Sequence, residues 1–339
     1  MILSPLSALY GRLTGLRAGW YASGRLAAEP LPHPTISVGN LTLGGTGKTP
    51  FSAFLARRLR LEGWRPAILS RGYGRRSRGV VVVSAGEGPL ASADDAGDEP
   101  AALARAEPGV IVVVGARRAD AARRASELGA DLFVLDDGFQ HLAVRRDVNL
   151  LLLDSADPFG GGHLPPAGRL RERVDAVARA DAIVFTRVQR AAPERAAVET
   201  LARLAPRAPV FHARIRAAGL ADESGAPLAP EAIAPRPLLS VCGIARPESF
   251  AATLAELGLS PEERLEFRDH QRYGPRQLAR IRAAAERTGS SFLVTTEKDA
   301  VKLAGRTPLP LVTVRLAVEV EEPGFFALVA SRLPRREGR

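Results

Sequence analysis

Residues 35–50 read TISVGNLTLGGTGKTP, and this stretch decides the fold class. An apolar, strand-like run ending at Val38 is followed by a glycine-rich turn that closes on Lys48 and Thr49. In such a turn the backbone amides converge on phosphate oxygens, and the following helix contributes the positive end of its dipole. The lysine reaches the β and γ phosphates, and the hydroxyl can ligate Mg²⁺. The stretch therefore predicts a phosphate-binding loop (P-loop) for ATP, made of Thr42, Leu43, Gly44, Gly45, Thr46, Gly47, Lys48 and Thr49. A glycine-rich turn with a chance Lys-Thr pair is the alternative.

Outward from this loop, short apolar runs alternate with stretches rich in Ala, Leu and Arg. This rhythm predicts an α/β fold: a P-loop NTPase-like parallel sheet flanked by helices. The expected strands are residues 35–38, 67–70, 80–84, 110–114, 132–135, 150–154 and 182–186, and the expected helices are 50–62, 99–107, 116–128 and 171–180.

A passage rich in Pro and Ala, residues 205–237, interrupts the rhythm and is typical of a connector. A second series follows, with strands expected at 238–242, 292–295 and 311–314 and helices at 247–257 and 275–287. We therefore expect four parts: an N-terminal helix (1–30), a P-loop kinase domain (31–210), a connector (211–236) and a second, smaller α/β lobe (237–339).

The chain is strongly basic, with 339 residues and a formal net charge of +10. Of its 47 basic residues, 44 are arginines and only three are lysines: Lys48, Lys298 and Lys302. This excess favours an anionic partner, whether nucleic acid, phospholipid or a phosphorylated small molecule. Aromatic residues make up only 5% of the chain and the arginines are dispersed, so we expect no nucleic-acid partner. A single cysteine, Cys242, cannot form an internal disulfide, which favours a reducing cytoplasmic setting.

The amino terminus has a distinctive pattern, because its only charges before Glu29 are arginines. Apolar residues recur at helical spacing between them, which predicts an amphipathic helix in a membrane interface. A helix docked on the protein's own core fits the pattern equally well. No run is long enough to span a bilayer, and a secretory signal is not expected. The apolar residues are Leu3, Leu6, Tyr10, Leu13, Leu16 and Trp20, and the arginines are Arg12, Arg17 and Arg25.

Acidic residues supply two further candidates. Asp136 and Asp137 end an apolar strand, where P-loop proteins place a carboxylate that holds Mg²⁺ or its water, although a solvated strand end is the alternative. Asp98 lies in an acidic cluster before a helix, where it could be a catalytic base or a helix N-cap. Arginines such as Arg117 and Arg171 could neutralise phosphates, although any one of so many could simply face solvent.

The chain resembles the tetraacyldisaccharide 4′-kinases, the lipid A kinases, through six motifs that keep their order. A general P-loop has glycine at the position of Thr42, and a threonine at this position resembles the loop of this family. The motifs are SVGN before the loop (37–40), SRGYG (70–74), GDEP (97–100), DDGFQH (136–141), GRLRE (168–172) and TTEKD (295–299).

This resemblance implies transfer of the ATP γ-phosphate to the 4′-hydroxyl of a tetraacylated glucosamine disaccharide 1-phosphate, at the cytoplasmic face of the bacterial inner membrane. It implies ATP and Mg²⁺ as cofactors, and an anionic membrane surface and the lipid as partners. By position, Lys48 and Asp98 are catalytic, with Asp98 as base and His270 beside it, although a lone histidine is more often structural. The implied metal residues are Thr49, Asp136, Asp137 and Glu172, and the implied phosphate and substrate residues are Asn40, Tyr73, Arg117, Gln140 and Arg171.

A membrane-recruited P-loop ATPase acting as a nucleotide switch is the competing interpretation. GTP is disfavoured, because no Asn-Lys-x-Asp motif is present and residues 297–299 only partly match it.

Overall fold

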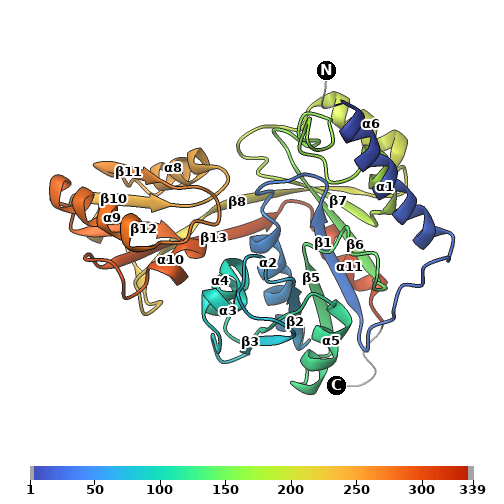
Figure 1. Ribbon diagram of the computed structural model, residues 1–339, viewed down its shortest axis with the longest axis horizontal. Helices are drawn as coiled ribbons and strands as arrows, with labels where there is room; N and C mark the ends of the chain where they lie inside the picture. Colours follow the sequence, from blue (N-terminus) through green and yellow to red (C-terminus); the bar gives the residue numbers. More distant parts are fainter. Residues whose placement is uncertain (1–3, 335–339) are drawn as a thin grey trace. The chain divides into compact units, whose positions relative to one another are not determined.

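The computed structural model describes residues 4–334 (Figure 1). Its contacts divide the chain into two compact units. The first contains residues up to Arg71, Gly115–Ile215 and the C-terminal segment from Val318; the second contains Gly72–Val114 and Arg216–Ala317.

The first unit is built on a parallel sheet with strand order β8-β7-β6-β1-β5-β2. Its register pairs Val38 with Asp136. The carboxyl ends of the P-loop strand and the acidic strand therefore lie side by side, as the α/β prediction requires. Five strands are buried along their whole length, which explains their continuous apolar sequences. These five strands are β1 (Thr35–Asn40), β2 (Pro66–Ser70), β5 (Leu132–Asp136), β6 (Val148–Asp154) and β7 (Ala182–Thr186), and the sixth strand of the sheet, β8 (Val210–Ala221), is only partly buried.

Helices accompany this sheet, and the P-loop helix α2 (Lys48–Leu61) is central to it, burying Phe51, Leu55 and Leu59. The expected helix at 171–180 is instead a 3-10 helix, η1 (Val174–Arg179). The other helices are α1 (Ser4–Ala22), α5 (Arg118–Glu127), α6 (Arg195–Leu204) and α11 (Gly324–Arg332).

The second unit has its own parallel strands in the order β11-β10-β12-β13. It also contains an antiparallel pair, β3 with β4, and the helix α4 that begins at Asp98. Helix α10 makes extensive contacts with α4. The strands are β3 (Val81–Ala85), β4 (Ile111–Val114), β9 (Pro227–Leu228), β10 (Leu238–Cys242), β11 (Glu263–Glu266), β12 (Phe292–Thr296) and β13 (Leu311–Val320). The helices are α3 (Ala93–Ala96), α4 (Asp98–Ala106), α7 (Pro230–Ile233), α8 (Pro247–Glu256), α9 (Pro275–Thr288) and α10 (Glu297–Leu303).

The compact units differ from the domain boundaries expected from the sequence. Residues 72–114 group with the second unit, although they precede more than half of the first unit in the chain. The physical reason is tertiary, since α4 packs on α10, about 200 residues later in the sequence. The expected connector, 211–236, contains β9, α7 and most of the long strand β8 rather than irregular chain. Residues 1–3 and 335–339 of the expected terminal parts lie outside the described residues.

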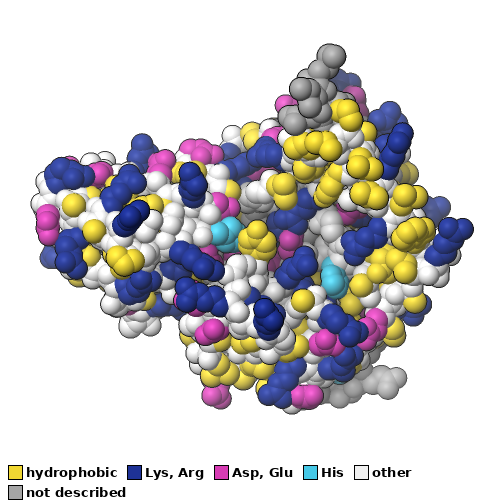
Figure 2. All heavy atoms as spheres, viewed as in Figure 1, with side chains coloured by type: hydrophobic (Ala, Val, Ile, Leu, Met, Phe, Trp, Pro, Cys, Tyr) yellow, Lys and Arg dark blue, Asp and Glu magenta, His cyan; other side chains and the backbone are white. Residues whose placement is uncertain are grey.

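Helix α1 leaves the large apolar side chains of the N-terminal pattern partly exposed, although the Tyr10 hydroxyl donates to the carbonyl of Arg171 at 3.1 Å. Leu6, Tyr10, Leu13, Leu16 and Trp20 are between 38% and 59% exposed, and Figure 2 shows hydrophobic side chains gathered over this helix. Leu3 lies outside the described residues.

The contact side of α1 is formed by small residues. The Ser7 hydroxyl donates to the carbonyl of Leu164 at 2.9 Å, and a Cβ at the buried Gly11 would lie 2.6 Å from Leu164. The helix therefore docks on the protein, and it does so through small residues rather than through its large apolar side chains. Within residues 4–334, no helix combines the length and apolarity that crossing a membrane requires.

Candidate functional site

The P-loop occupies the turn between β1 and α2 in the first unit. Gly47 precedes the helix in the left-handed region, with φ 81°, and a Cβ there would lie 2.3 Å from Ile215. Lys48 begins the helix, and its ammonium lies 3.1 Å from Oδ1 of Asn40 and 3.5 Å from Oδ1 of Asp137. The strand, loop and helix thus occur in the predicted order.

The two aspartates after β5 have different environments. Asp136 is buried, and the Ser52 hydroxyl donates to its Oδ1 at 2.9 Å. Asp137 is in the left-handed region, φ 56°, and Arg171 donates to both of its carboxylate oxygens at 2.7 Å. Burial alone raises the pKa of Asp137, but the charges of Lys48 and Arg171 outweigh it and hold the pKa below its ordinary value. Asp137 is therefore an ionised neighbour of the P-loop lysine.

Two further predicted residues are joined to this cluster. The buried amide of Asn40 donates to the carbonyl of Thr42 at 2.8 Å, which connects the strand end to the loop. Gln140 donates to the carbonyl of Asn40 at 2.8 Å. The structure therefore brings together Asn40, Lys48, Asp137, Gln140 and Arg171.

Glu172 and Arg117 are placed differently. The carboxylate of Glu172 is buried and pairs with Arg179 at 2.7 Å. Arg117 is exposed and lies 3.7 Å from Glu29 and 3.9 Å from Asp120. Neither residue is joined by these contacts to the P-loop cluster, so both assignments remain predictions.

Asp98 lies in the second unit, at the first residue of α4. The N-cap is Gly97, so the side chain of Asp98 does not cap its own helix, and this alternative is wrong. Its Oδ2 instead accepts from the Lys302 ammonium at 3.0 Å and lies 3.5 Å from Nδ1 of His270. Burial alone raises the pKa of Asp98, but the hydrogen bond from His270 and the charge and hydrogen bond of Lys302 hold it below its ordinary value.

His270 adopts a left-handed backbone conformation, φ 56°, which is rare for a residue with a side chain. Its Nε2 lies 3.3 Å from the ammonium of Lys298. Because an ammonium is only a donor, Nε2 is the acceptor, and the ring proton of neutral His270 is on Nδ1, facing Asp98. Contacts at both nitrogens argue against a merely space-filling histidine.

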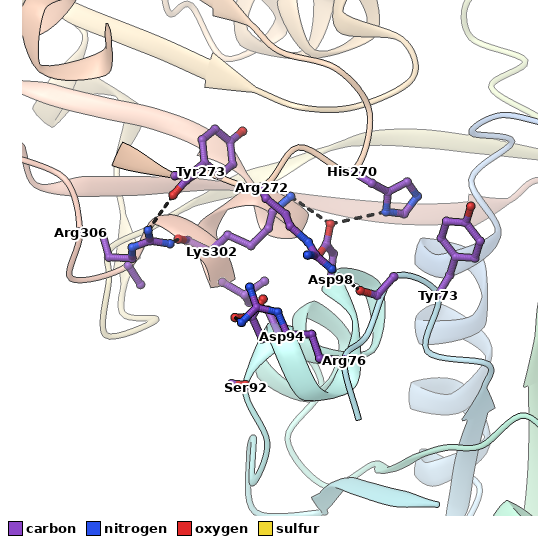
Figure 3. A pocket seen from close by; sticks show the side chains of 15 residues that line it. Tyr73, Arg76, Ser92, Asp94, Asp98, His270, Arg272, Tyr273, Lys302 and Arg306 are labelled. Carbon is purple, nitrogen blue, oxygen red and sulfur yellow. Dashed lines mark hydrogen bonds and ion pairs between the residues drawn. The ribbon is translucent and has the colours of Figure 1, made fainter. Parts of the chain in front are cut away.

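Asp98 and His270 line a cavity of about 350 Å³ in the second unit (Figure 3). Tyr73, also predicted from the sequence, lines it with its ring 5.4 Å from that of His270. Sequence reasoning missed Lys302, which lines the cavity, and Lys298, which contacts His270. The available signal was their rarity, since two of the three lysines in the chain lie in or just after the TTEKD motif.

Comparisons with known proteins show the family of the chain. The family model described as tetraacyldisaccharide-1-P 4′-kinase matches residues 1–334. A tetraacyldisaccharide 4′-kinase of Pelobacter propionicus is 43% identical over 306 residues, covering 90% of this chain and 83% of the relative. One from Anaeromyxobacter dehalogenans (strain 2CP-C) is 46% identical over 294 residues, covering 85% and 77%.

Among solved structures, the "apo" form of LpxK from Aquifex aeolicus in complex with ATP is similar, with a TM-score of 0.81 and 32% identity. That comparison covers 97% of this chain and 98% of the other. The P-loop α/β fold expected from the sequence is thereby confirmed, and the chain belongs to the tetraacyldisaccharide-1-P 4′-kinase family.

Proposed function

We propose that the protein transfers the γ-phosphoryl group of ATP to the 4′-hydroxyl of a tetraacylated glucosamine disaccharide 1-phosphate, with Asp98 as the base. Family membership supports the reaction, and the ATP complex of the LpxK relative supports the donor. One observation carries the base assignment. Asp98 does not cap its helix but lines a cavity, with its Oδ2 held by Lys302 beside His270.

The chemical step is an in-line displacement. The hydroxyl oxygen forms a bond to the γ-phosphorus, the bond from that phosphorus to the β-γ bridging oxygen breaks, and its electron pair leaves with ADP. Asp98 accepts the hydroxyl proton and becomes neutral. Lys48 and Arg171 offer positive charge for the phosphate oxygens.

Mg²⁺ fits the donor groups at the end of β5 and the start of α2. The carboxylates of Asp136 and Asp137 and the hydroxyl of Thr49 are hard oxygen donors, the type that Mg²⁺ prefers. Asp136 is buried within one hydrogen bond of Ser52, on the same helix as Thr49. When bound, the ion would neutralise charge on the ATP phosphates. We assign Thr49 and Asp136 to it first, and keep Asp137 and Glu172 as further candidates.

We also propose that α1 holds the protein on an anionic membrane at the cytoplasmic face. The exposed side of α1 presents Leu13, Leu16 and Trp20, and the neighbouring charges Arg12 and Arg17 are basic. An apolar helix side bordered by arginines suits the interface of an anionic bilayer. A substrate with four acyl chains resides in that phase, so peripheral attachment would bring enzyme and substrate together.

The function is tested by incubating the protein with ATP, Mg²⁺ and the disaccharide 1-phosphate lipid in detergent micelles. Mass spectrometry should find a lipid heavier by one phosphate. Loss of ATP without that product would support the nucleotide switch instead. Asp98→Asn keeps the side-chain size and should lower kcat by about 100-fold or more. An unchanged kcat in this variant would show that Asp98 is not the base.

A further inference from the structure

Lys302 is a buried lysine whose ammonium is held by three acceptors. It lies in the last turn of α10, and its side chain is only 8% exposed. Its ammonium contacts Oδ2 of Asp98, Oδ1 of Asp299 and the carbonyl of Gln271, each at 3.0 Å. An ammonium has three protons to donate, so these contacts use its full capacity.

Asp299 is the second carboxylate that holds the Lys302 ammonium, in addition to Asp98. Its side chain is 0% exposed, and its Oδ1 also accepts from the Tyr273 hydroxyl at 3.0 Å. Its Oδ2 accepts from the Gly243 amide and the Thr296 hydroxyl, both at 2.8 Å. A buried carboxylate is tolerated when it is paired and hydrogen-bonded in this way. The ammonium therefore has one immobile partner and one partner, Asp98, that lines the cavity.

The choice of lysine is informative in a chain that uses arginine for 44 of its 47 basic residues. A compact ammonium can reach three acceptors arranged around one point, whereas a planar guanidinium spreads its donors in a fork. Both Lys302 and His270 approach Oδ2 of Asp98. Among residues 4–334, both of these contacts of the Asp98 carboxylate fall on Oδ2 and neither falls on Oδ1.

We propose that Lys302, anchored by Asp299, is a positioning residue for the phosphoryl transfer: it fixes the Asp98 carboxylate through Oδ2 and leaves Oδ1 to accept the hydroxyl proton. The lysine stays protonated throughout, and the proton moves only from the hydroxyl to Asp98. The proposal rests on the proposed role of Asp98 as base.

The charges around Asp98 set the pH dependence of activity, which a lysine with a purely structural role would leave unchanged. Lys302 on α10 and His270 in the loop before α9 face the carboxylate directly. Lys298 and Glu99 form a second layer around His270, and Asp299 lies behind Lys302. The positive charge of Lys302 lowers the pKa of Asp98, so its removal should move the acid limb of the activity profile to higher pH.

The test compares Lys302→Met, Lys302→Arg and Asp98→Asn with the full-length protein, measuring kcat and KM for the lipid from pH 5 to 9. We expect Lys302→Met to lower kcat by about 10- to 100-fold with KM changed by less than about threefold, and to shift the acid limb upward. Lys302→Arg keeps the charge, so the acid limb should stay at the position of the parent protein, with part of kcat restored. Arg287→Gln removes an exposed ion pair with Glu263 in the same unit and is the matched control.

Loss of Lys302 removes the cationic partner of the buried Asp299 carboxylate, which destabilises the folded state of Lys302→Met. The double variant Asp299→Asn with Lys302→Met removes both charges and should show the same loss of kcat and the same shift of the acid limb. An unshifted limb with kcat within threefold of the parent, in either folded variant, overturns the proposal. If Asp98→Asn is inactive in that case, only the role of Lys302 fails; if Asp98→Asn is fully active, the proposed base fails as well.

Discussion

The ammonium of Lys298 lies 3.3 Å from Nε2 of His270, while Nδ1 of the same ring lies 3.5 Å from Oδ2 of Asp98. Lys298 therefore selects the tautomer in which the ring proton faces the carboxylate. Lys298 also lies 2.7 Å from Asp269, the neighbour of His270 in the chain. The lysine thus contacts both the ring and the segment that carries it.

Replacing Lys298 with Met should release the His270 ring. We expect kcat to fall by about tenfold, because the proton donor to Asp98 is then no longer fixed in one tautomer. The ¹⁵N chemical shifts of the ring report the tautomer directly, and the chain has only five histidines, which makes assignment practical. The role assigned to Lys298 is wrong if the Nδ1-protonated form persists in the variant.

Asp136→Asn should weaken the response to Mg²⁺. The carboxamide keeps an acceptor for Ser52 but loses the charge offered to the ion. Half-maximal activity should require about tenfold more Mg²⁺, and chelation with EDTA should abolish activity in both proteins. Asp175→Asn is the control, since Asp175 forms an exposed ion pair with Arg173. Equal Mg²⁺ curves for the parent and Asp136→Asn would remove Asp136 from the metal site.

The membrane role of α1 is tested by placing charge on its exposed side. The double variant Leu13→Glu with Leu16→Glu should sediment with anionic phospholipid vesicles at least tenfold less than the parent protein. Its kcat with substrate in detergent micelles should be unchanged, because these side chains face away from the protein. Leu61→Glu on α2 is the control, since Leu61 is also an exposed leucine. Retained vesicle binding in the double variant would contradict anchoring by α1.

His141, in the DDGFQH motif, should make stability depend on pH. Burial, together with the charges of Arg118 and Arg146, lowers its pKa to about 4 from an ordinary 6.5. A group with a lowered cationic pKa takes up its proton on unfolding, so the native state loses stability as the pH falls from about 6.5 to about 4.

The variant His141→Gln has no such proton to take up. Between pH 7.5 and pH 5, its free energy of unfolding should fall by about 1 kcal/mol less than that of the parent, after allowance for solvent screening. Urea unfolding at the two pH values measures this difference. Parallel losses in the two proteins would show that the native structure does not lower the pKa of His141.

The P-loop and its flanking elements could be predicted because local chemistry decides them. Only glycine adopts the backbone of position 47 without strain, and the apolar runs of β1 and β5 are buried on both faces. Parallel pairing then brings Asp136 beside Val38, so the acidic strand end could also be anticipated. The exposed arrangement of α1 could not, because helical periodicity identifies a face without saying whether the small or the large residues dock.

The sequence by itself determined the phosphate-binding loop and the α/β alternation, since each depends on neighbouring residues and on the strand or helix they form. The role of Asp98 as base was implied by the family resemblance, because the residues alone left a helix N-cap equally open. Only the tertiary structure decided what Asp98 contacts. Lys302 is separated from it by about 200 positions and reaches it because α10 packs against α4. Contacts between residues so far apart depend on how the helices pack, and the local sequence pattern does not predict which helix will lie beside α4. The scarcity of lysine distinguishes Lys298 and Lys302 in the sequence. Only the structure shows that Lys302 pairs with the buried carboxylate of Asp299.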